Sequence, residues 1–150
     1  MYKVAICDDN PADLQLITDY LTEPEFHYPL ELSSFHDGVE LAQAYKKEGQ
    51  YDLIILDMMM DRLNGIETAL KIRKVDQNVA ILIVTATVEY AIEGYKINAA
   101  RYIVKPVSKP EFKKITKNIF ASIDKKRGGL LPFSQQERDY RHIHGRYLLF

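Results

Sequence analysis

Five short stretches of the chain are rich in β-branched and other large apolar residues and predict β-strands. Leu53–Leu56 and Val79–Val84 contain no polar residue, a pattern typical of strands that are buried on both faces of a parallel sheet. Leu30–Phe35 instead alternates between apolar and polar positions, which favours a strand at or near an edge of the sheet. The other two predicted strands are Tyr2–Cys7 and Arg101–Val104.

The segments between these strands carry apolar residues every three or four positions and predict helices. The first helix follows Asn10 and has a proline at its first position, and the second follows Asp37 with a glutamate three residues later, as in a capping box. We expect helices from Pro11 to about Thr22, from Gly38 to Gly49, from Ile66 to Lys74, from Glu89 to Asn98, and from Ser108 toward Lys126. Because strands and helices alternate, we expect an α/β domain with a doubly wound parallel sheet and helices on both faces.

The composition is that of a globular protein, since 47% of the 150 residues are hydrophobic. The formal net charge is only -1, so no overall field attracts the chain to nucleic acid or to an anionic membrane. The single cysteine, Cys7, excludes an internal disulfide framework and a cysteine-cluster metal site. With no long apolar span and no signal-peptide pattern at the N-terminus, we expect a cytoplasmic protein that makes no membrane contact.

The last part of the chain departs from the alternation of strands and helices. Residues 127–150 contain glycines, a proline and scattered charges, and they sustain no helical period. We expect one folded domain over residues 1–126, followed by a linker. The final residues would then form either a tail or the clipped beginning of another domain.

Polar residues at the carboxyl ends of the predicted strands point to one common site. Asp8 and Asp9 follow the first strand, Asp57 the third, Thr85 the fourth and Lys105 the fifth. Because parallel strands present these ends at one edge of the sheet, the three carboxylates would lie close together and repel one another without a cation. Mg²⁺ suits such a set of oxygen ligands. A phosphoryl group on Asp57 would present its oxygens to the metal, the lysine ammonium and the threonine hydroxyl.

Each of these residues also has an ordinary structural explanation. Asp8 and Asp9 could merely cap the first helix, Thr85 could be an ordinary strand end, and Lys105 could be a solvated surface lysine. The coincidence of such residues at the ends of four strands favours a site over these separate explanations.

Together these residues resemble the receiver domain of CheY-like, two-component response regulators. The resemblance covers roughly Tyr2 to Lys126. It depends on the aspartate pair, on the strand LIILDMMM with Gly65 at the expected distance, on Thr85-Ala86, and on Tyr102 before Lys105-Pro106. It implies a flavodoxin-like fold, with a five-stranded parallel sheet in the order 2-1-3-4-5 and five helices.

The resemblance also assigns a role to each residue of the site. Asp57 would be the phosphoacceptor, and Asp8, Asp9 and Asp57 would hold Mg²⁺ together with the backbone carbonyl of Met59. In the family, the remaining residues act on the phosphoryl group or respond to it. Thr85 and Lys105 would contact that group, Thr85 and Tyr102 would form the switch, and the Lys105-Pro106 bond would be cis.

The expected partners follow from the same resemblance. A sensor histidine kinase, or a small phosphodonor, would supply the phosphoryl group, and the face of the fourth helix, fifth strand and fifth helix could form a homodimer. Three segments resemble the corresponding parts of regulators that carry a LytTR-type DNA-binding domain: Glu89-Tyr90-Ala91, Ala100-Arg101-Tyr102 and residues 140–150. The chain would then be a truncated transcriptional regulator, which contacts DNA only through a domain absent from this chain.

In the receiver family the fourth residue after the phosphoacceptor is often proline, whereas this chain has Asp61. The loop after Asp57 would then be less stiff, and Asp61 would bring a fourth carboxylate close to the metal.

Two other functions stay open. A Mg²⁺-dependent phosphohydrolase with an aspartyl phosphate usually needs a second acid where this chain has Met59. An interaction module that works without phosphorylation would not need the whole acidic set. We therefore expect no enzyme, apart from self-catalysed phosphoryl transfer and dephosphorylation.

Overall fold

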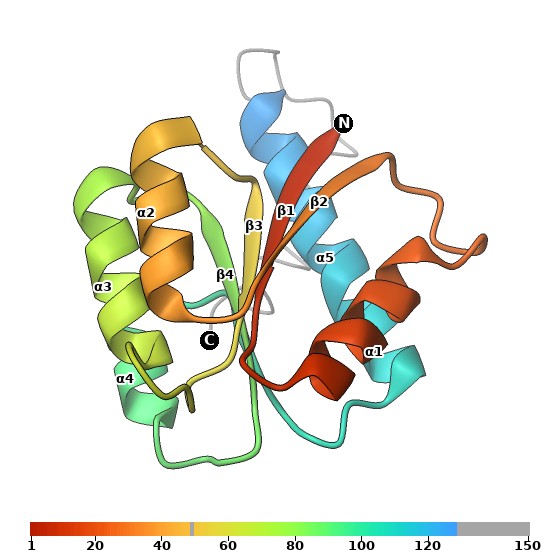
Figure 1. Ribbon diagram of the computed structural model, residues 1–150. Helices are drawn as coiled ribbons and strands as arrows, with labels where there is room; N and C mark the ends of the chain where they lie inside the picture. The colour runs from red at the N-terminus through yellow and green to blue at the C-terminus, as the bar shows by residue number, and fades with distance from the viewer. Residues whose placement is uncertain (49, 129–150) are drawn as a thin grey trace.

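The computed structural model describes residues 1–48 and 50–128, and within them the chain forms a five-stranded sheet and five helices (Figure 1). All neighbouring strands are parallel, and their order is β2-β1-β3-β4-β5, as expected. The strands are β1 (Tyr2–Cys7), β2 (Leu30–Phe35), β3 (Leu53–Leu56), β4 (Ala80–Thr85) and β5 (Arg101–Val104). The helices are α1 (Pro11–Thr22), α2 (Gly38–Glu48), α3 (Gly65–Val75), α4 (Ala91–Lys96) and α5 (Lys109–Arg127).

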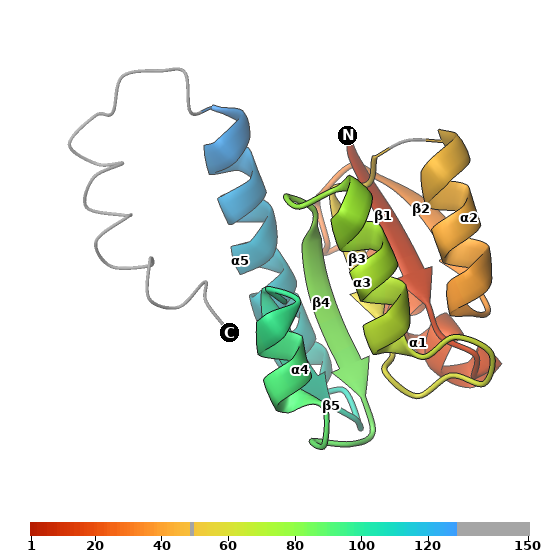
Figure 2. The ribbon, with the colours of Figure 1, turned by 90° about the vertical axis from the view of Figure 1, so that its left-hand side faces the viewer.

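The helices cover both faces of the sheet, so that two separate apolar cores form (Figures 1 and 2). In β1, Val4 and Ile6 belong to the core beneath α1 and α5, whereas Ala5 and Cys7 belong to the core beneath α2 and α3. Strand β3 divides in the same way, and all four of its residues are buried. A strand between two cores needs apolar residues at every position, because successive side chains point to opposite faces. This explains the unbroken apolar pattern of Leu53–Leu56.

The strand register determines which residues meet at the carboxyl edge. Cys7 pairs with Leu56, and the amide of Asp57 donates to the Cys7 carbonyl at 3.0 Å, so the acids that follow the two strands become neighbours. On the other side, the amide of Lys105 donates to the Thr85 carbonyl at 2.8 Å.

Four of the described helices begin with side-chain caps. Asn10 accepts from the amides of Ala12 and Asp13, and Asp37 accepts from the amide of Glu40 at 2.8 Å, both as the sequence indicated. Ser108 accepts from the amide of Glu111 at the start of α5. The cap of α3 was not predicted. Asn64 and Glu67 form a reciprocal capping box there, so the helix begins at Gly65.

The fourth helix is shorter than the predicted range of Glu89 to Asn98, and only part of its apolar stripe is buried. It spans Ala91–Lys96. Of the apolar residues that the helical spacing places on one side, Ile92 is 70% and Tyr95 is 69% exposed, whereas Ile97, just after the helix, is buried. The buried residue within the helix is Gly94, which lets the backbone itself approach the sheet. Asn98, at a φ of 59°, then turns the chain into β5.

The C-terminal end of α5 contacts residues at the amino edge of the sheet, where strands β1 and β3 begin. The Tyr2 hydroxyl donates to Asp124, and Arg127 pairs with Asp52 and lies 5.0 Å from the centre of the Tyr2 ring. The helix therefore extends one residue beyond the expected boundary at Lys126. Residues 129–150, which hold most of the predicted linker and the possible beginning of another domain, lie outside the described residues, as does Gly49. In the described ranges, no helix combines the length and apolar character that a membrane span requires.

Candidate functional site

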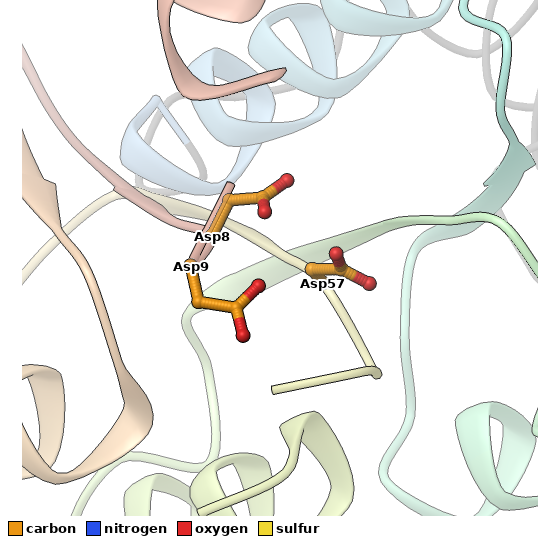
Figure 3. Close-up of side chains that lie close together, drawn as sticks. All are labelled: Asp8, Asp9 and Asp57. Atoms are coloured by element: carbon orange, nitrogen blue, oxygen red, sulfur yellow. The ribbon is translucent and has the colours of Figure 1, made fainter. Parts of the chain in front are cut away.

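Three carboxylates meet at the carboxyl edge of the sheet (Figure 3). Asp8, Asp9 and Asp57 each offer an oxygen atom, and these atoms lie within 4.8 Å of one another. Asp8 and Asp57 are only 5% and 6% exposed, and Asp9 is half-buried. The sheet pairing of β1 with β3 brings the acids together, as the sequence predicted.

The ammonium group of Lys105 lies among these acids and uses all of its donors on carboxylates. Its Nζ donates to Asp8 at 2.9 Å, to Asp57 at 3.0 Å and to Asp13 at 2.8 Å. Burial works against the charged form, but the hydrogen bonds to Asp13, Asp8 and Asp57 outweigh it and raise the pKa of Lys105 above its ordinary value. Lys105 is therefore a fixed positive charge at neutral pH.

Burial also acts on the Asp8 carboxyl group. It raises the pKa of Asp8, although the Asn10 amide and the Lys105 ammonium both favour the ionised form. A buried carboxylate of this kind gains from a cation in its neighbourhood, because the cation compensates the lost hydration.

Asp13 is the member of this charge network that the sequence analysis missed. It lies in the first turn of α1, four residues after Asp9, and is separated from Lys105 by 92 positions in the chain. Its only sequence signal is that spacing, which places it one helical turn beyond the aspartate pair. Only the fold shows that the ionic partner of Asp13 is Lys105.

Thr85 is fully buried at the end of β4, and its Oγ1 has no hydrogen-bond partner among the described residues. Buried hydroxyl groups nearly always have a partner, so this one fits an oxygen of a group that enters the site. On the neighbouring strand β5, Tyr102 pairs with Ile83 and is half-buried, and its hydroxyl donates to the backbone carbonyl of Thr87. The Lys105-Pro106 peptide bond is cis, as expected.

The loop after Asp57 folds tightly back on the acid. The Met59 amide donates to Asp57 Oδ1 at 3.0 Å, and the Gly65 amide donates to the Met58 carbonyl at 3.0 Å. A Cβ atom on Gly65 would lie 2.4 Å from the Asp57 carbonyl oxygen, so no other residue fits there without a shift of the backbone. Asp61 is exposed and does not belong to the group of three carboxylates.

A groove of about 590 Å³ lies at the opposite, amino edge of the sheet, between the ends of α3 and α5. Arg73, Arg101 and Lys126 line it, but none of the clustered carboxylates does. Arg73 donates to the backbone carbonyls of Ile97 and Val79, which gives it a structural use. We therefore place the candidate functional site at the carboxyl edge of the sheet, where Asp8, Asp9 and Asp57 cluster, and call this region the acidic edge.

This acidic edge can hold a divalent cation and a phosphoryl group together. Three clustered carboxylates supply the hard oxygen ligands that Mg²⁺ prefers. The Lys105 ammonium and the unpartnered Thr85 hydroxyl add two donors for anionic oxygens. Asp57 belongs to the cluster of carboxylates and also accepts from Lys105.

Comparison with known proteins agrees with this geometry. Residues 4–117 match the family model of the response regulator receiver domain, and this range contains every residue of the acidic edge. The transcriptional regulatory protein CusR of Escherichia coli K12 is 34% identical over 106 residues, which cover 69% of this chain and 44% of CusR. The transcriptional regulatory protein LytR of Staphylococcus aureus N315 is 31% identical over 121 residues, which cover 80% of this chain and 48% of LytR. The chain thus spans about half the length of these curated relatives.

Solved structures show the same fold. The response regulator TrrA of Thermotoga maritima, crystallised in complex with Mg²⁺ and BeF, has 29% identity and a TM-score of 0.69, and the match covers 79% of this chain and 99% of TrrA. The response regulatory domain of MrkE from Klebsiella pneumoniae has 24% identity and a TM-score of 0.73, and the match covers 82% and 98%. Fold, acidic edge and sequence together show that the chain belongs to the response regulator receiver domain family of two-component signalling.

Proposed function

We propose that this chain is a phosphoacceptor receiver whose reacting group is the Asp57 carboxylate. One observation carries the proposal: Asp57 is buried in a cluster with two further carboxylates, and its Oδ2 lies 3.0 Å from the Lys105 ammonium. The unpartnered Thr85 hydroxyl in the same region supports it.

In the proposed reaction, an Asp57 oxygen attacks the phosphorus atom of a donor in line with the bond that breaks. The donor is a phosphohistidine of a sensor kinase, or a small phosphodonor, and its leaving group departs with the electron pair. The product is an acyl phosphate on Asp57. Water later attacks this phosphate, so dephosphorylation is also self-catalysed and no separate substrate is turned over.

The other residues of the site position the reacting groups. Asp8, Asp9 and Asp57 would hold Mg²⁺, with the Met59 carbonyl as a further proposed ligand. When bound, the ion would neutralise the charge that gathers on the phosphoryl oxygens. Lys105 would donate to one of these oxygens in place of its present bond to Asp57.

We further propose that phosphorylation changes the outer face built from α4, β5 and α5. Thr85 would donate its free hydroxyl to the phosphoryl group, and Tyr102 would leave the Thr87 carbonyl and turn inward. The α4 side of this face already exposes Val88, Ile92 and Tyr95, and Val104 of β5 is 42% exposed. Such an apolar surface suits a homodimer of receivers.

The output of the switch would be transcription, through a DNA-binding domain that follows the receiver. In this proposal, residues 1–126 form the receiver, and residues 127–150 form a linker that leads into a LytTR-type domain. It is supported by the regulators named above, which are about twice as long as the matched segments. A longer gene product with a basic, β-rich continuation would support it further.

The proposed function is tested by intact mass spectrometry after incubation with acetyl phosphate. We expect a mass increase of one phosphoryl group in the presence of Mg²⁺, and none after chelation of the ion or in Asp57→Asn. An adduct that persists in Asp57→Asn would overturn the proposal, as would the lack of any adduct in the parent chain.

A further inference from the structure

Lys105 has three carboxylate partners, and one of them differs from the other two. Asp13 makes the shortest of the three bonds, at 2.8 Å, and its side chain is 36% exposed, whereas those of Asp8 and Asp57 are 7% exposed. The Asn10 cap accepts from the amides of Ala12 and Asp13 and so fixes the first turn of α1, from which Asp13 reaches the lysine.

The carboxylates that bind the lysine and those that could bind a metal ion form overlapping sets. Asp8 and Asp57 belong to both, because they accept from Lys105 and also lie in the group whose oxygens approach within 4.8 Å. Asp13 belongs only to the lysine set. A cation in the cluster must therefore compete with Lys105 for Asp8 and Asp57, but not for Asp13.

We propose that Asp13 is a positioning residue that holds the Lys105 ammonium on the α1 side of the pocket and so limits this competition. With Asp13 in place, the lysine keeps one ionic partner when Asp8 and Asp57 turn to the metal ion and to the phosphoryl group. This inference rests on the proposed function, because it gives Asp13 a task in Mg²⁺ binding and phosphoryl transfer at the same site.

Removal of the Asp13 carboxylate leaves the ammonium with two partners, both of them metal-binding acids. The lysine is then drawn more strongly to Asp8 and Asp57, and the ion has to displace it without compensation. We expect Mg²⁺ affinity to fall in Asp13→Asn by about three- to tenfold, the size of an ordinary coupling between neighbouring groups. The initial rate of phosphorylation by acetyl phosphate at subsaturating Mg²⁺ should fall in parallel.

A loss of affinity could also reflect the lost negative charge, and a double-mutant cycle separates the two causes. Mg²⁺ is titrated by calorimetry into the parent chain, Asp13→Asn, Lys105→Met and the double variant. If Asp13 acts through the lysine, Asp13→Asn weakens binding in the parent but leaves it nearly unchanged in the Lys105→Met background. Equal weakening in both backgrounds would overturn the proposal, and so would unchanged affinity in Asp13→Asn.

Two further variants complete the design. Asp13→Glu keeps the charge at the same helix position and should restore most of the affinity. Asp19→Asn removes an exposed carboxylate from the same helix and should bind Mg²⁺ like the parent. A parent chain that gains no phosphoryl group would contradict the proposed function itself, whereas a normal parent with an unaffected Asp13→Asn would contradict only the role of Asp13.

Discussion

Replacement of Thr85 by valine should stabilise the protein, although it removes a residue of the functional site. The Thr85 side chain is fully buried, and its hydroxyl has no hydrogen-bond partner in the described part of the chain. A buried polar group without a partner costs roughly 1 to 3 kcal/mol, and valine has almost the same shape. We therefore expect the free energy of unfolding of Thr85→Val to rise by about 1 to 2 kcal/mol, which corresponds to a melting temperature roughly 2 to 8 °C higher for a chain of this size.

The assay is urea unfolding followed by circular dichroism, without phosphodonor. Thr116→Val is the matched control, because Thr116 is equally buried but donates to the Phe112 carbonyl at 2.9 Å. The control should lose about 1 kcal/mol, since it gives up a satisfied hydrogen bond. If Thr85→Val lost as much stability as Thr116→Val, the Thr85 hydroxyl would have a partner in the resting protein, and the reasoning would be refuted.

Three further predictions concern the surroundings of the site. Mg²⁺ binding should weaken as the pH falls, because protonated Asp8 cannot bind the ion. Since burial raises the pKa of Asp8, calorimetric titrations should show this loss of affinity at a higher pH than for an ordinary aspartate, and a pH-independent affinity would contradict the prediction. The Cys7 thiol is buried, and this burial raises its pKa. Iodoacetamide should therefore label Cys7 in urea but not in buffer, and rapid labelling of the folded chain would count against the burial. Gly65→Ala should lower the free energy of unfolding by about 1 to 3 kcal/mol in urea titrations, because its Cβ would lie 2.4 Å from the Asp57 carbonyl oxygen, and unchanged stability would refute this close approach.

The sequence predicted the sheet because its pattern is strongly constrained. Strands between two cores, such as Leu53–Leu56, carry apolar residues at every position, a pattern typical of a parallel sheet that is covered on both faces. The same logic placed Asp8 and Asp57 at one edge, since the ends of neighbouring parallel strands lie side by side. The acidic cluster was thus predictable from local pattern and topology together.

Features that depend on contacts between distant segments were not predictable in this way. The apolar stripe of Ile92 and Tyr95 has helical spacing, but spacing does not distinguish a face that packs on the core from one that is exposed. Asp13 has the composition of an ordinary first-turn acid, and only the position of Lys105 in space gives it a partner. Asn64 was overlooked as a cap because the loop before it has no regular pattern.

The central claim is that Asp57 accepts a phosphoryl group, and peptide mapping by tandem mass spectrometry tests it most directly. The chain is incubated with acetyl phosphate and Mg²⁺, digested at low pH to preserve the acyl phosphate, and sequenced by fragmentation. The account predicts that the phosphoryl group is found on Asp57. A phosphoryl group on any other residue, or none on a chain shown by circular dichroism to be folded, would contradict it.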